Sequence, residues 1–280
     1  MAELGKRNQL PVLREAAHGL HLDGGDRGEI LLPRRYITDA AVPGAILDVF
    51  LYRDSEDRLV ATTETPLAMV GDFAFLKVVS WDRSLGAFLD WGLPKDLLLP
   101  RREQASSIKP GDWIVVHVSL DEKSDRIVAS ARLNRALSRT PPDYPPYHPV
   151  RLLIAEETPL GYNAIVENAH AGLLHRSEIG VDLKIGQRLD GFVRSVRNNG
   201  KLDIVLDRAG FQRIAPLTEK ILAALQANGG RLPYHDKTPP EEIRDAFGAS
   251  KKAFKQAVGA LYRKRAIDIR PDGIRLVRPR

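Results

Sequence analysis

The side chains of this sequence that could bind a charged ligand are concentrated near its C-terminus. Residues 211–280 contain 15 Lys or Arg against 7 Asp or Glu, an excess of eight positive charges in a chain whose net charge is +6. Five of these cations lie in one short segment: Lys251, Lys252, Lys255, Arg263 and Lys264. Positive charge concentrated in this way attracts the phosphates of a nucleic acid, because each phosphate that a cation neutralises releases condensed counterions. The alternative is a solvated basic surface without a ligand.

Residues for catalysis or for a cofactor follow no familiar pattern. The chain has no cysteine, which excludes disulfides, thiolate zinc sites and thiol nucleophiles. It has no P-loop, no Gly-x-Gly-x-x-Gly turn, and no His-Glu-x-x-His or Gly-x-Ser-x-Gly motif. His18 and His21 are three residues apart, which places them on opposite faces of a strand and argues against a metal pair. We expect no enzyme, no cofactor and no metal; a metal-dependent nuclease is the alternative that composition leaves open.

An internal repeat organises the first 210 residues. The motif LLPRR occupies residues 31–35 and returns at residues 98–102, an offset of 67. Three further pairs of similar segments keep this offset to within one residue: 18–23 with 85–90, 42–52 with 109–119, and 57–62 with 125–130. Separate segments in one register indicate tandem structural units.

A third copy follows at an offset of 75. Gly86 corresponds to Gly161, Gly111 corresponds to Gly186, and the LLP of the motif becomes LLH at residues 173–175. The eight extra residues lie mostly in the segment TPPDYPPYHP, residues 140–149. Its prolines favour a semi-rigid extended spacer between the second and third repeats.

Each repeat consists of short apolar runs separated by Gly, Pro and Asp, which predicts about five short strands and no long amphipathic helix. Five short strands suit a small closed barrel such as the OB fold, whose face and loops most often bind single-stranded nucleic acid or oligosaccharide. The predicted fold is mainly β with a C-terminal α+β domain. The predicted domains are three tandem five-stranded OB-fold barrels at residues 1–64, 65–139 and 147–210, then a fourth domain at 214–280.

The fourth domain has helical periodicity. A first helix is predicted over residues 217–228, with Ile221, Leu222 and Leu225 on one stripe and a stop at Gly229. A second is predicted to start with Thr238 as N-cap, Pro239 at N1 and Glu241 at N3, and to end at Gly248.

A third helix is predicted after Ser250, with Phe254, Val258 and Leu261 buried and the basic residues on another face. The Asp272-Gly273 pair then predicts a hairpin turn. Three helices and a hairpin make a winged helix, in which the third helix can enter a major groove and the hairpin can contact phosphate.

The segments GLLHRSEI with LKIGQRLDGFVRSV, and LGAFLDWG with KPGDWIVVHV, resemble the S1 domain, an RNA-binding OB module. In that family, aromatics on strands two and three stack on bases, and a basic residue on the last strands contacts phosphate. The family's Phe-Gly-x-Phe corresponds here to residues 18–21, 85–88 and 160–163, and no repeat keeps both aromatics.

The resemblance implies site residues in the repeats. The family's His is His175, replaced by Pro33 and Pro100 in the other two repeats, and the late-strand cation corresponds to Arg58, Arg126 and Lys201. The implied nucleic-acid-binding residues are Phe88, Trp91, Arg101, Arg126, Tyr162, His175, Arg176, Arg194, Arg197 and Lys201. The alternatives are that Phe88 fills a core, that Trp81 and Trp91 cap a barrel end, and that Arg34, Arg35, Arg101 and Arg102 are solvated loop charges.

The order of three S1-like repeats and a winged helix, with the segment GAFLDWGLPKDLLLP, resembles the bacterial conserved virulence factor B family over essentially the whole chain. That resemblance implies a non-catalytic, RNA-binding, regulatory protein. Single-stranded RNA is therefore the expected partner, and the alternatives are a DNA-binding regulator and a protein-interaction adaptor acting through the winged helix. The lack of an apolar run of about 18 residues and of an export signal predicts a cytoplasmic protein without a membrane partner.

Overall fold

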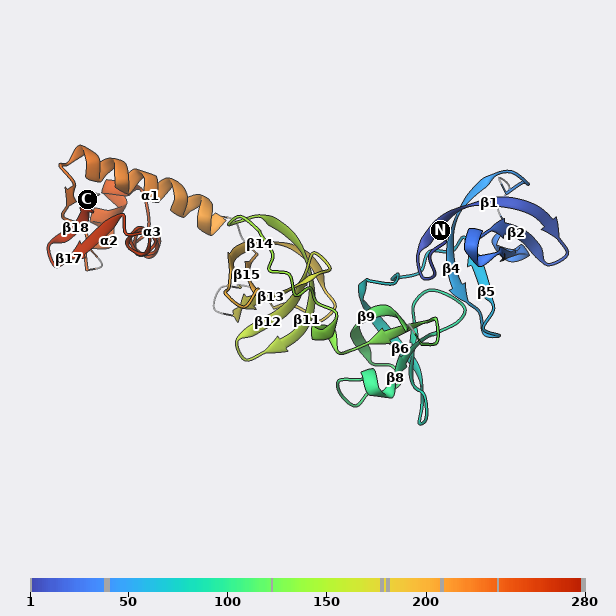
Figure 1. The fold of residues 1–280 in the computed structure, drawn as a ribbon. Coiled ribbons are helices and arrows are strands. Elements are labelled where there is room, and N and C mark those ends of the chain that lie inside the picture. Colours follow the sequence, from blue (N-terminus) through green and yellow to red (C-terminus); the bar gives the residue numbers. More distant parts are fainter. Residues whose placement is uncertain are drawn as a thin grey trace. The chain divides into compact units, whose positions relative to one another are not determined.

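The computed structural model describes residues 2–37, 41–121, 123–176, 179, 182–206, 209–235 and 237–277, without the side chains of residues 209–216 and 252. The chain divides into two compact units, Met1–Val205 and Leu206–Arg280. Figure 1 shows barrels of β-strands in the first unit, and helices with a small sheet in the second. Among the described helices, none is long and apolar enough to cross a membrane.

Three closed barrels of five strands each make up the first unit, and all have the same strand order. In each, the first strand pairs with the second and the fourth, while the third and fifth strands pair in parallel. The predicted mainly-β fold with three OB-type barrels is therefore confirmed.

The strands of the first barrel are β1 (Arg7–Ala16), β2 (Gly19–Asp23), β3 (Glu29–Pro33), β4 (Ile46–Arg53) and β5 (Leu59–Thr62). Those of the second are β6 (Phe73–Asp82), β7 (Gly86–Asp90), β8 (Leu97–Pro100), β9 (Trp113–Asp121) and β10 (Arg126–Ser130). Those of the third are β11 (Pro149–Thr158), β12 (Gly161–Val166), β13 (His170–His175), β14 (Arg188–Val196) and β15 (Leu202–Val205).

The repeated LLPRR motif forms the end of the third strand of a barrel and the turn after it. Strand β3 leads into the 3₁₀ turn η2 (Arg34–Tyr36), and β8 leads into η3 (Arg101–Glu103). A glycine at the start of the second strand pairs with the last residue of the third strand in every barrel, and its φ is positive each time: Gly19, Gly86 and Gly161. The backbones approach so closely there that only glycine fits, which explains why the register of the repeats is kept.

The joints between consecutive barrels are apolar. Phe50 and Tyr52 of the first barrel join the core of the second barrel beside Trp91. Phe73 of the second barrel packs with Leu153 of the third. Consecutive barrels of the first unit are therefore held together by side-chain packing in addition to the polypeptide segments that link them.

The proline-rich spacer has neither helix nor strand in residues 140–148, as predicted. It is nevertheless packed along the third barrel, since the Tyr144 ring lies 5.9 Å from that of His170, and the N–H of Val193 donates to the carbonyl of His148 at 3.0 Å. The backbone N–H of Ser138 also donates to the carbonyl of Ala169 at 2.8 Å.

The second unit is the predicted winged helix. Its helices are α1 (Ala209–Ala227), α2 (Pro240–Phe247) and α3 (Lys251–Arg263), and its sheet has the order β16 (Arg231–Leu232), β18 (Gly273–Leu276), β17 (Ile267–Arg270). Ile221, Leu225, Ile243, Phe254 and Ile274 form the fully buried centre of its core.

The helix ends in this unit agree with the sequence except at the starts of α1 and α2. Helix α1 begins at Ala209, eight residues before the predicted start at residue 217. Ser250 accepts from the N–H of Ala253 at 3.2 Å, and Gly248 ends α2 in the left-handed conformation, as predicted. The predicted capping box is wrong: Thr238 instead accepts from the N–H of His235 at 2.9 Å, and Pro239 is the N-cap. Pro240 disfavours helical geometry in the residue before it, so the helix cannot start at Pro239.

Candidate nucleic-acid interface

Phe88 is an aromatic side chain that strand alternation turns outward on β7 of the second barrel. Its neighbours Ala87 and Leu89 are fully buried, while Phe88 is half-buried on the other side of β7. It lies opposite Leu98 of β8, which pairs with Val128 of β10, and both are also half-buried. The ring therefore belongs to an apolar strip across three strands, where an unpaired base could stack.

The positions equivalent to Phe88 in the other barrels hold polar side chains with acidic neighbours. His21 Nδ1 lies 3.0 Å from the carboxylate of Glu29. Asn163 Nδ2 donates to Glu156 at 2.8 Å. Neither barrel offers an aromatic ring at this position.

Two of the aromatics that the resemblance implied as contacts are buried. Trp91 is 3% exposed; its ring meets that of Phe50 edge-on at 5.8 Å, and its Nε1 donates to the Lys95 carbonyl at 2.6 Å. Tyr162 is also 3% exposed and lies under the guanidinium of Arg176 at 5.4 Å. Neither ring has a face open to a base, so both are corrected to packing roles.

The cations implied on the late strands are mostly ion-paired. Arg58 contacts Asp54 at 2.7 Å, and Arg126 donates from two nitrogens to the carboxylate of Asp57, both at 3.1 Å. A phosphate would have to displace these carboxylates to reach either guanidinium. Lys201 differs, because it is exposed and no side chain that the structure describes pairs with its ammonium group.

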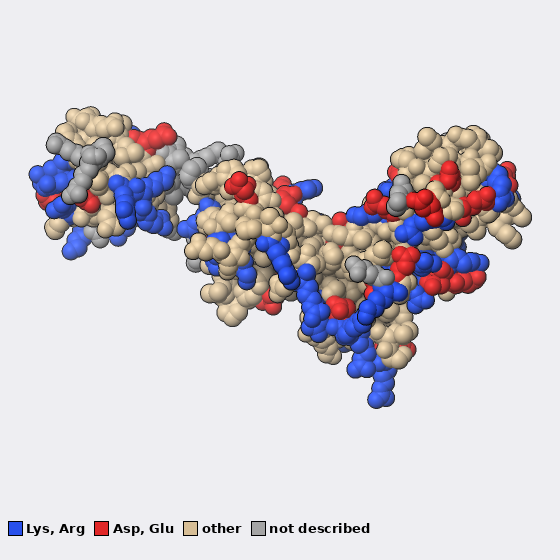
Figure 2. Space-filling model, in the orientation of Figure 1, with Lys and Arg blue, Asp and Glu red and all other residues tan. Residues whose placement is uncertain are grey.

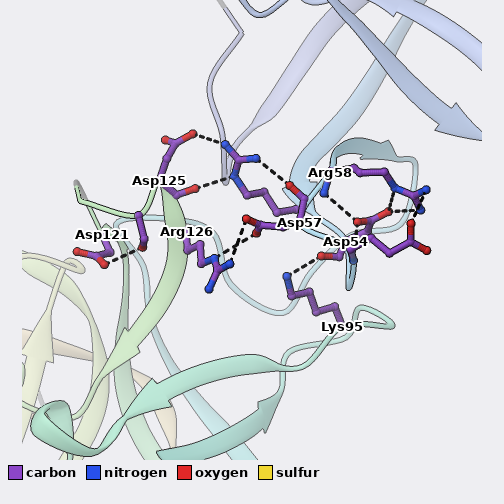
Figure 3. A network of polar contacts seen from close by, with 10 residues as sticks. Asp54, Asp57, Arg58, Lys95, Asp121, Asp125 and Arg126 are labelled. Carbon is purple, nitrogen blue, oxygen red and sulfur yellow. Dashed lines mark hydrogen bonds and ion pairs between the residues drawn. The ribbon is translucent and has the colours of Figure 1, made fainter. Parts of the chain in front are cut away.

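Arg126 and Asp57 belong to a polar network that joins the first and second barrels (Figure 3). Arg53 donates to the carboxylate of Asp125 at 2.8 Å and to its carbonyl at 3.0 Å. Lys95 donates to the carbonyl of Asp54 at 2.7 Å. Asp57 and Asp125 occupy equivalent turns in their repeats, both with positive φ, and each accepts from an arginine of the neighbouring barrel. Arg58, the equivalent of Arg126, instead pairs with Asp54 in its own turn.

We expect acid to weaken this joint. Hydrogen bonds from Arg126 hold the pKa of Asp57 below its usual 3.8. A carboxyl whose pKa is lower in the folded state contributes stability that is fully present above its unfolded-state value and is lost as pH falls through the folded-state value. The unfolding midpoint should therefore fall as pH drops below 3.8, and Asp57→Asn should reduce this acid dependence.

Thermal unfolding between about pH 6 and 2 measures this effect, since the acid limb of stability lies there. Trp81, Trp91 and Trp113 are the three tryptophans of the chain, so tryptophan fluorescence reports on the second barrel. Asp82→Asn is the comparison: hydrogen bonds from Ser84 and Leu85 of its own turn also lower the pKa of Asp82, so this variant should reduce the acid dependence of the second barrel without touching the joint. The prediction is contradicted if the unfolding midpoint of Asp57→Asn falls with decreasing pH as steeply as that of the unaltered protein.

His175 and Arg197 of the third barrel share one carboxylate. Arg197 Nε donates to Asp203 at 2.9 Å, His175 Nε2 lies 3.3 Å from the same oxygen, and Ser195 donates to the other oxygen at 3.0 Å. Burial alone would raise the pKa of Asp203, but the hydrogen bonds from Arg197 and Ser195 lower it by more than burial raises it. The pKa is therefore below its usual value, and the carboxylate stays ionised. The structure thus brings the predicted residues His175 and Arg197 together, but the Asp203 carboxylate neutralises the charge of Arg197.

Exposed cations gather at one end of the second barrel, and Figure 2 shows Lys and Arg side chains there. This cation cluster consists of Arg101, Arg102, Lys123, Arg132 and Arg135. Arg132 Nε donates to the Arg102 carbonyl at 2.7 Å. The hydrogen bond from Ser124 lowers the pKa of Asp121, and the charges of Arg102 and Lys123 nearby lower it as well.

Two acids accompany the cluster. Glu103 lies 3.8 Å from Arg135 and accepts from Ser130, and Asp121 accepts from Ser124. Five cations against two acids leave a positive surface at the ends of β8 and β10. Arg101 was predicted as a contact; Lys123, Arg132 and Arg135 were missed, because only the folded barrel brings their turns together.

The remaining predicted cations have mixed surroundings. Arg176 pairs with Glu157 at 2.7 Å, and Arg194 is exposed and makes interactions of its own. On the second unit, Lys255, Arg263 and Lys264 are exposed and Lys251 is half-buried. The side chain of Lys252 lies outside the described part of the chain.

Comparisons with known proteins agree with this domain content. Residues 219–276 match the CvfB-like winged helix domain, and residues 4–64 match the S1 domain. The chain is similar to the uncharacterized protein YitL of Bacillus subtilis, with 27% identity over 92% of this chain and 89% of the relative. It is also similar to conserved virulence factor B of Staphylococcus aureus, with 25% identity over 82% of this chain and 78% of the relative.

A solved structure also resembles the chain. It is a multidomain protein with nucleic acid binding domains from Streptococcus pneumoniae, 25% identical, with a TM-score of 0.42 and a match over 98% of both chains.

Proposed function

The chain is a relative of conserved virulence factor B, and from that premise we propose that it is a non-catalytic, regulatory protein that binds single-stranded RNA, chiefly on its second barrel. Its S1-type OB barrels and winged helix are domain types that bind nucleic acid. The observation that carries the proposal is the outward face of β7, β8 and β10, where Phe88 and the cation cluster share one surface.

This face combines the two contacts that an unpaired strand needs. The ring of Phe88 offers a stacking surface that every base can use. Leu98 and Val128 each lie two residues before the end of their strand, about 7 Å in extended strand, and the cations Arg101, Arg102 and Arg132 follow in the turns just beyond. An unpaired strand whose base stacks on Phe88 can thus place its following phosphates at the cation cluster.

The first and third barrels support binding less directly. The cations Arg14, Arg151 and Arg197 are each paired with a carboxylate, which reduces their attraction for phosphate. Lys201 remains available on the third barrel. Weak sites on tethered barrels still add to affinity, because the second contact is made at a high effective concentration.

The winged helix adds a second basic surface to the proposed function. Lys255, Arg263 and Lys264 project from the end and sides of α3, and α3 is the element that can enter a major groove in this fold. We assign this unit to nucleic acid, with duplex DNA and a protein partner as its alternatives.

The test of the second barrel is Phe88→Leu, which keeps an apolar side chain on the strip and removes the aromatic ring. Affinity for a fluorescein-labelled oligouridine, measured by anisotropy, should fall about five- to hundredfold, the contribution of one stacked base. Phe88→Trp should bind at least as tightly as the unaltered protein. Equal affinity in all three proteins would remove Phe88 from the interface.

Competition separates the alternatives for the full chain. Labelled single-stranded RNA is displaced by unlabelled RNA or by duplex DNA of the same length. Preference for the duplex would favour the DNA-binding regulator, and lack of binding to either would favour the adaptor. Incubation of the protein with labelled RNA and Mg²⁺ or Mn²⁺ tests the proposal that it is non-catalytic. Cleavage of the RNA that EDTA abolishes would contradict that proposal.

A further inference from the structure

The outward face of β6 and β9 is only partly covered by the third barrel. At one end, Phe73 and Val115 are buried against Leu153 and Ile165. Two residues further along β6 and β9, Phe75 is half-buried and Trp113 is 54% exposed. The apolar face therefore continues past the joint and ends in an aromatic pair, which the third barrel covers on the Phe75 side but leaves exposed at Trp113.

The aromatic pair is held firmly on its inner side. The rings of Phe75 and Trp113 lie 5.3 Å apart at an angle of 32°. The Phe75 ring packs on the backbone of Gly186 in the third barrel, where a Cβ would lie 2.0 Å from the ring. Trp113 thus lies on an anchored neighbour while more than half of its own surface faces solvent, an uncommon position for so large an apolar side chain.

Lysines surround this pair. Lys77 lies directly opposite Trp113 on the β6–β9 ladder. Lys109 belongs to the turn that precedes Trp113, and Lys184 to the turn that contains Gly186. All three are exposed, and none of the carboxylates that the structure describes pairs with them.

Acidic groups are fewer here. Asp112 is half-buried and accepts from the backbone N–H of Lys109, and Asp90 lies on the other side of Lys77 in the sheet. Three unpaired cations against these two acids leave the surroundings of Trp113 positive. An anionic ligand with a flat, apolar ring fits both features.

We propose that Trp113, supported by Phe75, is a second base-stacking site, which binds one unpaired base while Lys77, Lys109 and Lys184 attract the adjoining phosphates. This inference rests on the proposed function and extends it from Phe88 on β7 to Trp113 on β9, which lies two strands away from β7, beyond β6, in the closed strand order. One RNA strand that occupies both Phe88 and Trp113 must cross β6 and follow the curvature of the barrel. The contribution of Trp113 therefore requires a long strand.

The test uses the full chain and two labelled oligouridines, one of about 6 and one of about 20 nucleotides, since a single OB fold binds about 4 to 16. Trp113→Leu should weaken binding of the long strand about five- to hundredfold. It should leave binding of the short strand unchanged wherever that strand occupies the Phe88 face. Trp113→Phe should restore most of the affinity, and Lys77→Ala should lower the salt dependence by about one phosphate contact.

Trp81→Leu is the matched control, because Trp81 is 43% exposed on β6 and no aromatic ring that the structure describes pairs with it. Trp81→Leu should bind both strands normally, and its tryptophan fluorescence should still be quenched by the long strand. In Trp113→Phe that quenching should be largely lost. Circular dichroism confirms that each variant is folded.

Two failures are distinguishable. If the unaltered protein binds neither strand, the proposed function fails and this inference fails with it. If the unaltered protein binds, and Trp113→Leu binds the long strand equally well with unchanged quenching, only the second site is overturned, and the exposed pair becomes a candidate surface for a protein.

Discussion

Replacing Gly86 by Ala should lower the free energy of unfolding of the second barrel by about 2 to 4 kcal/mol, the range of a strained backbone combined with a steric clash. Gly86 has a φ of +135°, which L side chains rarely adopt. A Cβ at this position would lie 2.2 Å from the Leu99 carbonyl oxygen and 2.9 Å from the Arg101 nitrogen. Both are backbone atoms of the neighbouring strand and turn, so no side-chain rotation can relieve the contact.

Gly111→Ala is the control for this prediction. Gly111 has a φ of +93°, but a Cβ there would have no neighbour within 4 Å. Gly111→Ala should therefore lower the free energy of unfolding only by the strain of a left-handed residue, about 1 to 2 kcal/mol. Urea unfolding followed by tryptophan fluorescence compares the two, since all three tryptophans lie in this barrel. Equal losses in both variants would show that close backbone approach at Gly86 is not what fixes the repeat.

The same glycine explains why the fold could be predicted from the sequence. Gly19, Gly86 and Gly161 recur at offsets of 67 and 75, because each barrel needs the same close approach at the same strand pair. Strand alternation and turn residues are also local properties, so five strands per repeat could be predicted without knowledge of contacts between barrels. In the second unit, the Ser250 cap and the stripe of α3 are local in the same way.

The candidate site was harder to predict because the packing of one barrel on the next is not local. Alternation shows that Phe88 points outward, but nothing near Trp91 shows that Phe50, 41 residues earlier, covers it. Arg126 has the residue type of a phosphate contact, yet Asp57 lies against it from the preceding repeat. Trp113 illustrates the converse, since it shares the outward face of β9 with Val115, which the third barrel buries, but the third barrel stops short of it.

Neutralising the cation cluster should weaken RNA binding most strongly. The triple variant Arg102→Gln, Lys123→Gln and Arg135→Gln removes three exposed charges while keeping long polar side chains. Arg132 and Arg101 are left in place because they donate to the carbonyls of Arg102 and Arg83. The variant should therefore fold normally.

The expected loss follows from counterion release. The slope of log affinity against log salt is about −0.7 per phosphate contact for a single strand, so three lost contacts reduce it by about 2. Between roughly 1 M and 50 mM salt, about 1.3 decades, this difference amounts to on the order of a hundredfold or more in affinity at the lower salt. Anisotropy titrations of a labelled oligouridine at four or more salt concentrations measure both quantities.

A charge-matched control separates this surface from the net charge of the chain. Arg14, Arg58 and Arg151 each pair with a carboxylate at 2.6 to 2.9 Å, so their replacement by Gln removes the same formal charge from sites that are already neutralised. This control should shift the salt slope by much less than the cluster variant. If the two triple variants lose affinity equally, the RNA responds to overall charge, and the face that carries Phe88 has no special role in holding phosphates.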